Sequence, residues 1–262
     1  TATILALAGC DLPDYMDAQP LPTLGLEGPS PRTHIFGYLT QSWMAFDGRY
    51  KLAQLVRANR ALDDVCRAYN LPCISGKDSM KNDATLHGEK ISIPPTILFS
   101  LIGNHSDVRK AVSSDFKSVG DRIYLCGETH QELGASELSY LLRDESSGES
   151  GIGGRVPEID TERNLTMYRA LTAAMSEGLV ASAHDCSDGG LAAAIAECCF
   201  GSDSGATIDL TPIIDGGDID SWGALFGESL GRIVVSVKST HCEAFEAAMG
   251  SHACHALGTV EA

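Results

Sequence analysis

Three short segments of this sequence combine residue types that could bind a charged ligand. The first is Ile74–Asn82, in which a Ser-Gly turn precedes Lys77, Asp78 and Ser79. Lysine supplies positive charge to a phosphate and carboxylate supplies an oxygen ligand to Mg²⁺, so Lys77 and Ser79 are candidate phosphate ligands and Asp78 a candidate metal ligand. A surface Lys-Asp pair in a turn is the alternative. The segment is not a P-loop, because Leu71 and Asp78 stand where that motif needs glycine and a hydroxyl residue.

The second segment, His184–Gly190, lies between an expected strand and an expected helix. The first free N–H groups and the dipole of a helix favour an anion at its N-terminus, and adjacent glycines let the anion approach the backbone. Two aspartates there would repel a bare phosphate, so a bridging Mg²⁺ is expected. The candidates are Asp185 and Asp188 for the metal, and Ser187, Gly189 and Gly190 for the phosphate. The alternative is that Ser187 or Asp188 only caps the helix.

The third segment is Leu225–Arg232, which leads into an expected strand. Gly227 and Gly231 bracket a turn that could direct Glu228 or Arg232 at a site, and the guanidinium of Arg232 suits a substrate phosphate. A plain connection between helix and strand is the alternative. The sequence assigns no catalytic residue, because no nucleophile motif or Ser/His/Asp order is recognisable.

Hydrophobic periodicity predicts the elements that position these segments. The expected helices, given by apolar residues at helical spacing, are 51–69, 133–142, 161–177, 191–200 and 240–249. The expected strands are 1–10, 91–101, 122–127, 180–184, 207–210, 232–237 and 256–260. Alternating strands and helices in the second half predict a layered α/β (α+β) fold with mixed sheets and packed helices. A polar stretch near 105–120 predicts two domains, 1–110 and 111–262.

Composition excludes several classes of protein. The 262 residues include 19 Lys and Arg against 35 Asp and Glu, and the net charge of -16 argues against nucleic-acid or anionic-membrane partners. No apolar run approaches the ~18–20 residues that a membrane helix needs. The 9 cysteines lie in apolar contexts without a Cys-x-x-Cys motif, which predicts reduced core thiols in a cytoplasmic protein. The N-terminus has neither Met nor a charged leader region, so we expect a piece of a longer protein.

Several segments together resemble one enzyme family. They are Leu55–Ala58, Leu71–Asn82, Ile93–Ile97 with Ile102-Gly103, Glu132–Ser136, His184–Leu191 and Phe226–Glu228. In order and spacing, over roughly residues 50–240, they resemble the later half of the synthetase domain of phosphoribosylformylglycinamidine synthase. The resemblance implies a fold like that of aminoimidazole ribonucleotide synthetase, with an N-terminal domain that contributes to a shared barrel and a C-terminal α/β domain beside it.

The family resemblance implies an ATP-dependent ligase of purine synthesis. Its members convert formylglycinamide ribonucleotide, ATP and glutamine-derived ammonia to the amidine. By matching position, Asp185 would be a Mg²⁺ ligand and Ser187 a nucleotide contact, while Lys77 and Asp78 match a motif of the family. The nucleotide-covering loop, an early Glu-x-x-x-Asn metal pair and the glutaminase domain have no counterpart here, and the first 50 residues match poorly.

These departures predict one half of a synthetase that is inactive alone. Its expected partners are the other synthetase half and a glutaminase domain or subunit, and an exposed barrel face predicts a homodimer of this chain. Two alternatives remain open. One is a non-catalytic structural half with an auxiliary nucleotide site. The other is a related ATP-using protein such as selenophosphate synthetase, thiamine-phosphate kinase or a hydrogenase-maturation protein.

Overall fold

The computed structural model describes residues 35–39, 42–46, 51–72, 84–91, 99–105, 107–142 and 154–262. It divides the chain into two units, Thr1–Gly103 and Asn104–Ala262. The assignment of residues 1–110 and 111–262 to two domain types stays a prediction, and the strand expected over residues 1–10 lies outside the described residues. Among the helices described, none is long and apolar enough to cross a membrane.

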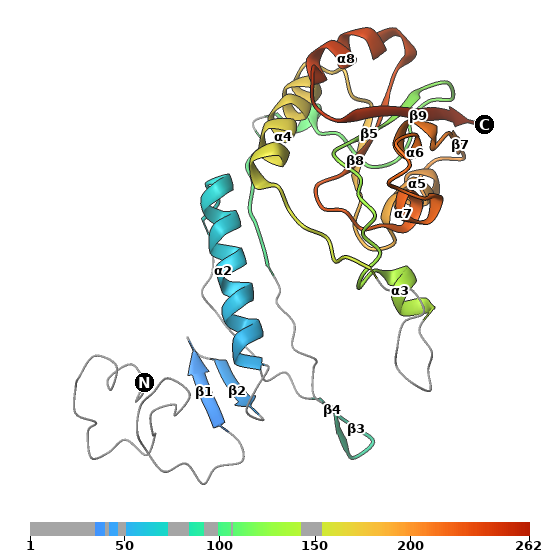
Figure 1. Ribbon diagram of the computed structural model, residues 1–262. Helices are drawn as coiled ribbons and strands as arrows, with labels where there is room; N and C mark the ends of the chain where they lie inside the picture. The colour runs from blue at the N-terminus through green and yellow to red at the C-terminus, as the bar shows by residue number, and fades with distance from the viewer. Residues whose placement is uncertain are drawn as a thin grey trace. The chain divides into compact units, whose positions relative to one another are not determined.

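The first unit contains two antiparallel hairpins and a long helix (Figure 1). Strands β1 (Ile35–Leu39) and β2 (Ser42–Phe46) form one hairpin, and β3 (Ala84–Leu86) and β4 (Glu89–Ile91) form the other. The predicted helix is confirmed with the same bounds as α2 (Lys51–Tyr69). It ends because Asn70 takes a left-handed conformation with φ of 53° and the amide of Leu71 bonds the carbonyl of Cys66 at 2.9 Å.

The second unit is built on a five-stranded sheet in the order β6-β8-β5-β9-β7. Its strands are β5 (Arg122–Cys126), β6 (Ser182–Asp185), β7 (Gly205–Ile208), β8 (Ile233–Val237) and β9 (Cys254–Glu261). The layered α/β class is confirmed, and every pair in this sheet is antiparallel where a mixed sheet was expected. No two consecutive strands of this sheet are neighbours, so the pairing depends wholly on long-range contacts.

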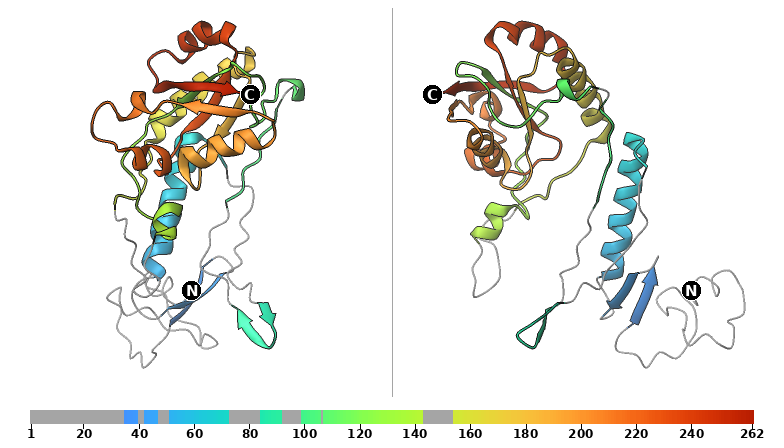
Figure 2. Two further views of the ribbon diagram at one scale, coloured as in Figure 1. Left: turned by 90° about the vertical axis from the view of Figure 1, so that its right-hand side faces the viewer. Right: turned by 180° about the vertical axis from the view of Figure 1, so that it is seen from behind.

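Helices cover both faces of this sheet. On one face lie α4 (Thr161–Ser176) and α8 (Cys242–Met249), and on the other lie α5 (Gly190–Phe200) and α6 (Thr211–Ile214) with α7 (Ser221–Phe226) beside them (Figure 1). Figure 2 gives the same layers from the side and from behind. The central strand β5 is apolar on both faces because Ile123 and Leu125 pack towards α5, whereas Tyr124 and Cys126 pack towards α4 and α8.

The structure corrects two local predictions and adds two short helices. The helix expected over 133–142 is shortened to α3 (Glu137–Leu141), because Ala135 has a φ of 60° and Ser136 caps the helix by accepting from the amide of Ser139 at 3.2 Å. Among the described residues of the strand expected over 91–101, Ile91 is the last residue of β4 and residues 99–101 are not in a strand. The short helices α6 and α7 were not expected.

Candidate functional site

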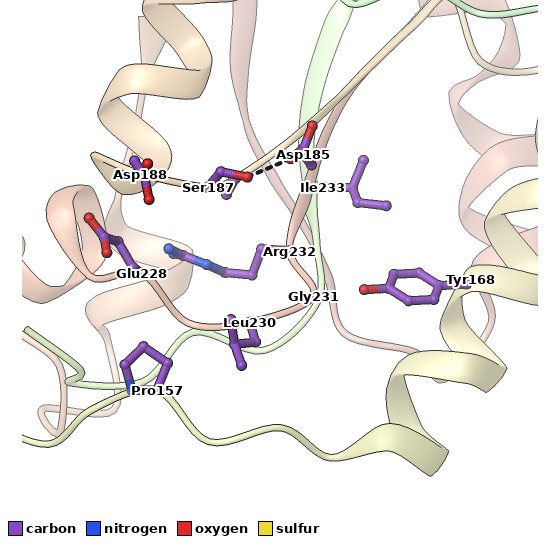
Figure 3. A pocket seen from close by; sticks show the side chains of 11 residues that line it. Pro157, Tyr168, Asp185, Ser187, Asp188, Glu228, Leu230, Gly231, Arg232 and Ile233 are labelled. Atoms are coloured by element: carbon purple, nitrogen blue, oxygen red, sulfur yellow. Dashed lines mark hydrogen bonds between the residues drawn. The ribbon is translucent and has the colours of Figure 1, made fainter. Parts of the chain in front are cut away.

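The second and third chemistry-bearing segments meet in one pocket of about 420 Å³ (Figure 3). One wall is the connection from β6 to α5, and another is the loop that precedes β8. The pocket is lined by Pro157, Tyr168, Asp185, Cys186, Ser187, Asp188, Glu228, Leu230, Gly231, Arg232 and Ile233. The strand pairing explains the meeting, because Asp185 at the end of β6 lies opposite Ile233 at the start of β8.

The loop after β6 presents oxygen atoms to solvent and anchors itself by its backbone. The amide of Cys186 donates to the carbonyl of Arg232 at 2.9 Å, and the Cys186 side chain is buried in the core. The side chain of Asp185 is 74% exposed, and the Oγ of Ser187 donates to its Oδ2 at 2.5 Å (Figure 3). The carboxylate of Asp185 and the hydroxyl of Ser187 are therefore two exposed oxygen groups that a hydrogen bond already holds together.

His184 lies between the backbone of this loop and helix α5. Its Nδ1 lies 2.7 Å from the carbonyl oxygen of Asp185, and its Nε2 lies 3.1 Å from the Oε2 of Glu197 on α5. Both partner atoms are hydrogen-bond acceptors, and a neutral imidazole has a single N–H, so the ring donates to one of the two at a time. The ring lies against the backbone of Asp185, whose carboxylate faces solvent.

Helix α5 begins without a side-chain cap. Its N-cap is Gly189, with φ of 79° and no capping side chain, so the alternative that Ser187 or Asp188 only caps the helix is wrong. Gly190 also has a positive φ, 65°, and a Cβ there would lie 2.5 Å from the carbonyl oxygen of Gly227. Glycine at this position lets the start of α5 pack directly against the loop that precedes β8.

Glu228 joins two elements at the pocket. Its Oε1 accepts from the amide of Gly189 at 2.9 Å and from the amide of Glu137 at 2.9 Å. A carboxylate is stable at the start of a helix, where N–H groups lack backbone partners. The sequence indicated that the turn could direct Glu228 at a site, but it did not predict these two hydrogen bonds, because nothing local shows which distant amides the carboxylate meets.

Arg232 is buried rather than extended into solvent. Its side chain is 1% exposed, and its three guanidinium nitrogens donate to the carbonyls of Ser229 (3.2 Å) and Gly227 and to the Oγ1 of Thr129 (3.3 Å). Figure 3 shows the guanidinium end pointing towards Glu228. Burial lowers the pKa of Arg232, against the opposing influence of Cys186, Glu132 and Glu228. In the structure these bonds let Arg232 hold the loop that precedes β8. Its contact with a substrate phosphate stays a prediction.

The donors for a metal ion are few in the described part of the chain. Within it, no group of three or more His, Cys, Asp or Glu side chains could hold a metal. Mg²⁺ commonly binds through one or two carboxylates together with substrate phosphates, and the open carboxylate of Asp185 fits that pattern. Lys77, Asp78 and Ser79 lie outside the described residues, so the metal and phosphate roles of all these residues stay predictions.

Comparisons with known proteins identify the second unit. The family model described as AIR synthase related protein, C-terminal domain, matches residues 118–262. Among solved structures, T. maritima PurL complexed with FGAR is 22% identical with a TM-score of 0.50, over 58% of this chain and 26% of that chain.

Two further structures are similar at lower scores. T. maritima PurL complexed with ATP is 20% identical with a TM-score of 0.44, over 58% of this chain and 23% of that chain. E. coli HypE is 20% identical with a TM-score of 0.40, over 57% of this chain and 46% of that chain. The match with PurL complexed with FGAR supports the fold, and it spans about a quarter of the length of that protein.

Proposed function

Through residues 118–262 the chain belongs to the family of AIR synthase related proteins, C-terminal domain, and on that premise we propose that it is part of an ATP-dependent ligase of purine synthesis. The proposed reaction forms an amidine from formylglycinamide ribonucleotide, ATP and glutamine-derived ammonia. The sequence resemblance supports this specificity. One structural observation carries the proposal: Asp185 and Ser187 form an open oxygen pair beside the glycine-started helix α5.

The charge of the chain supports a cation at this pair. A protein with a net charge of -16 repels polyphosphate unless a cation lies between them. Asp185 would hold Mg²⁺ and Ser187 would face the phosphate oxygens, while Gly189 and Gly190 would let the phosphate approach the backbone. The amides of these two glycines already donate to Glu228 (2.9 Å) and to the carbonyl of Ser187 (3.0 Å). Bound there, Mg²⁺ would neutralise phosphate charge, while the backbone of the loop fixes the position of the two donors.

The remaining assignments are part of the same proposal. The partners would be the other synthetase half and a glutaminase domain or subunit, with the chain itself associating as a homodimer in the cytoplasm. Lys77, Ser79 and Asp78 would complete the phosphate and metal ligands. The partner halves and the roles of Lys77, Ser79 and Asp78 rest on the sequence resemblance, the homodimer on the expected barrel face, and the location on the reduced thiols expected from the sequence.

Replacing Asp185 with asparagine tests the proposed metal role. The asparagine side chain keeps the shape and an oxygen that accepts from the Oγ of Ser187, but it removes the charge. We expect the affinity for Mg·ATP to fall at least tenfold, about 1.4 kcal/mol. The stability of the ligand-free protein should be unchanged or slightly raised, because repulsion from Asp188 is relieved. Isothermal titration calorimetry measures the affinity, and urea unfolding measures the stability.

Asp218→Asn is the matched control for this experiment. Asp218 is exposed and does not line the pocket, so its replacement removes the same charge elsewhere. Equal affinities of the Asp185 and Asp218 variants would contradict the metal role. A loss of ligand-free stability in Asp185→Asn, ~1–3 kcal/mol, would instead assign Asp185 to a structural hydrogen-bond network.

A structural nucleotide site is the second candidate, and Glu228 favours it. Its carboxylate already accepts the amide of Gly189 at 2.9 Å, so a fixed negative charge lies at the start of α5. A nucleotide held beside that charge would be retained through Mg²⁺ and need not turn over. Such a site predicts slow exchange of bound nucleotide and no ATP hydrolysis when the other synthetase half is added, whereas the ligase predicts substrate-dependent hydrolysis.

A further inference from the structure

Two cysteines face each other across neighbouring strands, outside the pocket just described. Cys126 is the last residue of β5 and Cys254 the first residue of β9, and the two are directly opposite in register. Their Sγ atoms are 3.5 Å apart. Cys126 is fully buried, whereas Cys254 is partly exposed. The two thiols are therefore in contact, although 128 positions separate them in the sequence.

The backbone around the pair suits a covalent bond between the sulfurs. The amide of Gly127 donates to the carbonyl of Ala253 at 2.9 Å, so Gly127 and Ala253 are a hydrogen-bonded pair. Cys126 and Cys254 are therefore the adjacent non-hydrogen-bonded pair, in which the Cα atoms of antiparallel strands lie about 4.5 Å apart. That separation is inside the range of roughly 4.4–6.8 Å found for disulfides, so the bond can form without moving the strands.

A second, polar cavity lies at this end of the sheet. It has a volume of about 280 Å³ and is lined by Gly127, Glu128, Arg163, Asn164, Met167, Ser251, His252 and Ala253. Two of these residues directly follow Cys126 and three directly precede Cys254. Met167 also packs in the same core cluster as Cys126. The cavity thus lies beside both strand ends, and its lining includes residues adjacent to the two cysteines but not the cysteines themselves.

We propose that Cys126 and Cys254 are an oxidative modification site, at which a hydroperoxide closes a reversible disulfide across β5 and β9. In the first step the thiol of Cys254 releases its proton and its sulfur attacks one peroxide oxygen. The O–O bond breaks, and the departing hydroxide takes up the released proton, which gives a sulfenic acid and one water. In the second step the sulfur of Cys126 attacks the sulfenic sulfur, and the hydroxyl group leaves with a proton as a second water. Two thiols lose two electrons, and one hydrogen peroxide is reduced to two waters.

The surroundings of the two thiols set the order of the steps. The hydrogen bond with Cys254, followed by burial, raises the pKa of the Cys126 thiol. Cys126 therefore stays protonated and reacts second, once the sulfenic acid is formed beside it. Cys254 is the more exposed of the two and meets the oxidant first.

The experiment uses the reduced full chain and hydrogen peroxide at low stoichiometry. We expect the intact mass to fall by about 2 Da and to return on addition of dithiothreitol. Digestion with trypsin and a glutamate-specific protease should yield one cross-linked species that joins Cys126 to Cys254, because cleavage after Glu246 separates Cys254 from Cys242. The neighbouring Cys198 and Cys199 serve as an internal control and should remain reduced.

Three variants make the test decisive. Cys254→Ala should abolish the mass loss, and Cys242→Ala, at a nearby cysteine, should leave it intact. Cys126→Ala should leave a sulfenic acid at Cys254 that dimedone labels, because the second thiol is missing. Since Cys126 is buried and that variant can fail to fold, Cys254→Ala alone is sufficient. A disulfide at other cysteines, or oxygen addition to Cys254 in the unaltered chain without mass loss, would overturn the proposal.

Discussion

Replacing Arg232 with methionine is expected to lower the free energy of unfolding by about 3–5 kcal/mol. Methionine keeps an unbranched side chain but loses the guanidinium, which donates to two carbonyls and to Thr129 in the interior. Glu132, 1% exposed and with an Oε2 that makes no hydrogen bond, then loses the positive charge that acts on it. Urea denaturation followed by circular dichroism measures the loss.

Two further variants separate charge from packing in this prediction. Arg122→Met changes an exposed arginine at the start of β5 and should alter the unfolding free energy by no more than about 0.5 kcal/mol. Glu132→Gln combined with Arg232→Met should recover part of the loss, because the uncompensated buried charge is gone. If Arg232→Met unfolds at the same urea concentration as the unaltered chain, the guanidinium does not hold the loop.

Local periodicity predicted the elements whose packing follows the chain. Helix α2 has the predicted bounds, and β5 was expected within one residue because its run of apolar residues is buried on both faces. The first half of the expected 133–142 helix failed for a physical reason. Leu133 is buried without being in a helix, so its apolar character matched the helical pattern by burial alone. Gly134 packs against the backbone of Gly154 and Arg155, a contact that helical spacing cannot predict.

Sheet order could not be predicted because it depends on residues far apart in sequence. Strand β5 lies between β8 and β9, more than one hundred positions further along the chain. The same limit applies to the site. The segments containing Asp185 and Arg232 were identified separately, and only the pairing of β6 with β8 brings them into one pocket. The bonds from Gly189 and Glu137 to Glu228 likewise need three distant segments at once.

Replacing Gly190 with alanine is expected to destabilise the chain by about 2–4 kcal/mol. Two costs combine. Gly190 has φ of 65°, which strains any residue with a Cβ, and that Cβ would lie 2.5 Å from the carbonyl oxygen of Gly227 and 2.8 Å from that of Leu225. Both obstacles are backbone atoms that cannot rotate away, so α5 and the loop must separate. Urea unfolding measures the loss of stability.

Gly178→Ala isolates the collision from the backbone strain. Gly178 has a φ of 75°, yet a Cβ there would meet nothing within 4 Å, so its replacement costs only the left-handed strain of about 1–2 kcal/mol. The difference between the two variants is the energy needed to part α5 from the loop that carries Glu228. That separation also stretches the bond from Gly189 to Glu228, so Mg·ATP affinity should fall in Gly190→Ala and stay unchanged in Gly178→Ala. Equal losses of stability in the two variants would mean that close packing at Gly190 does not fix the site.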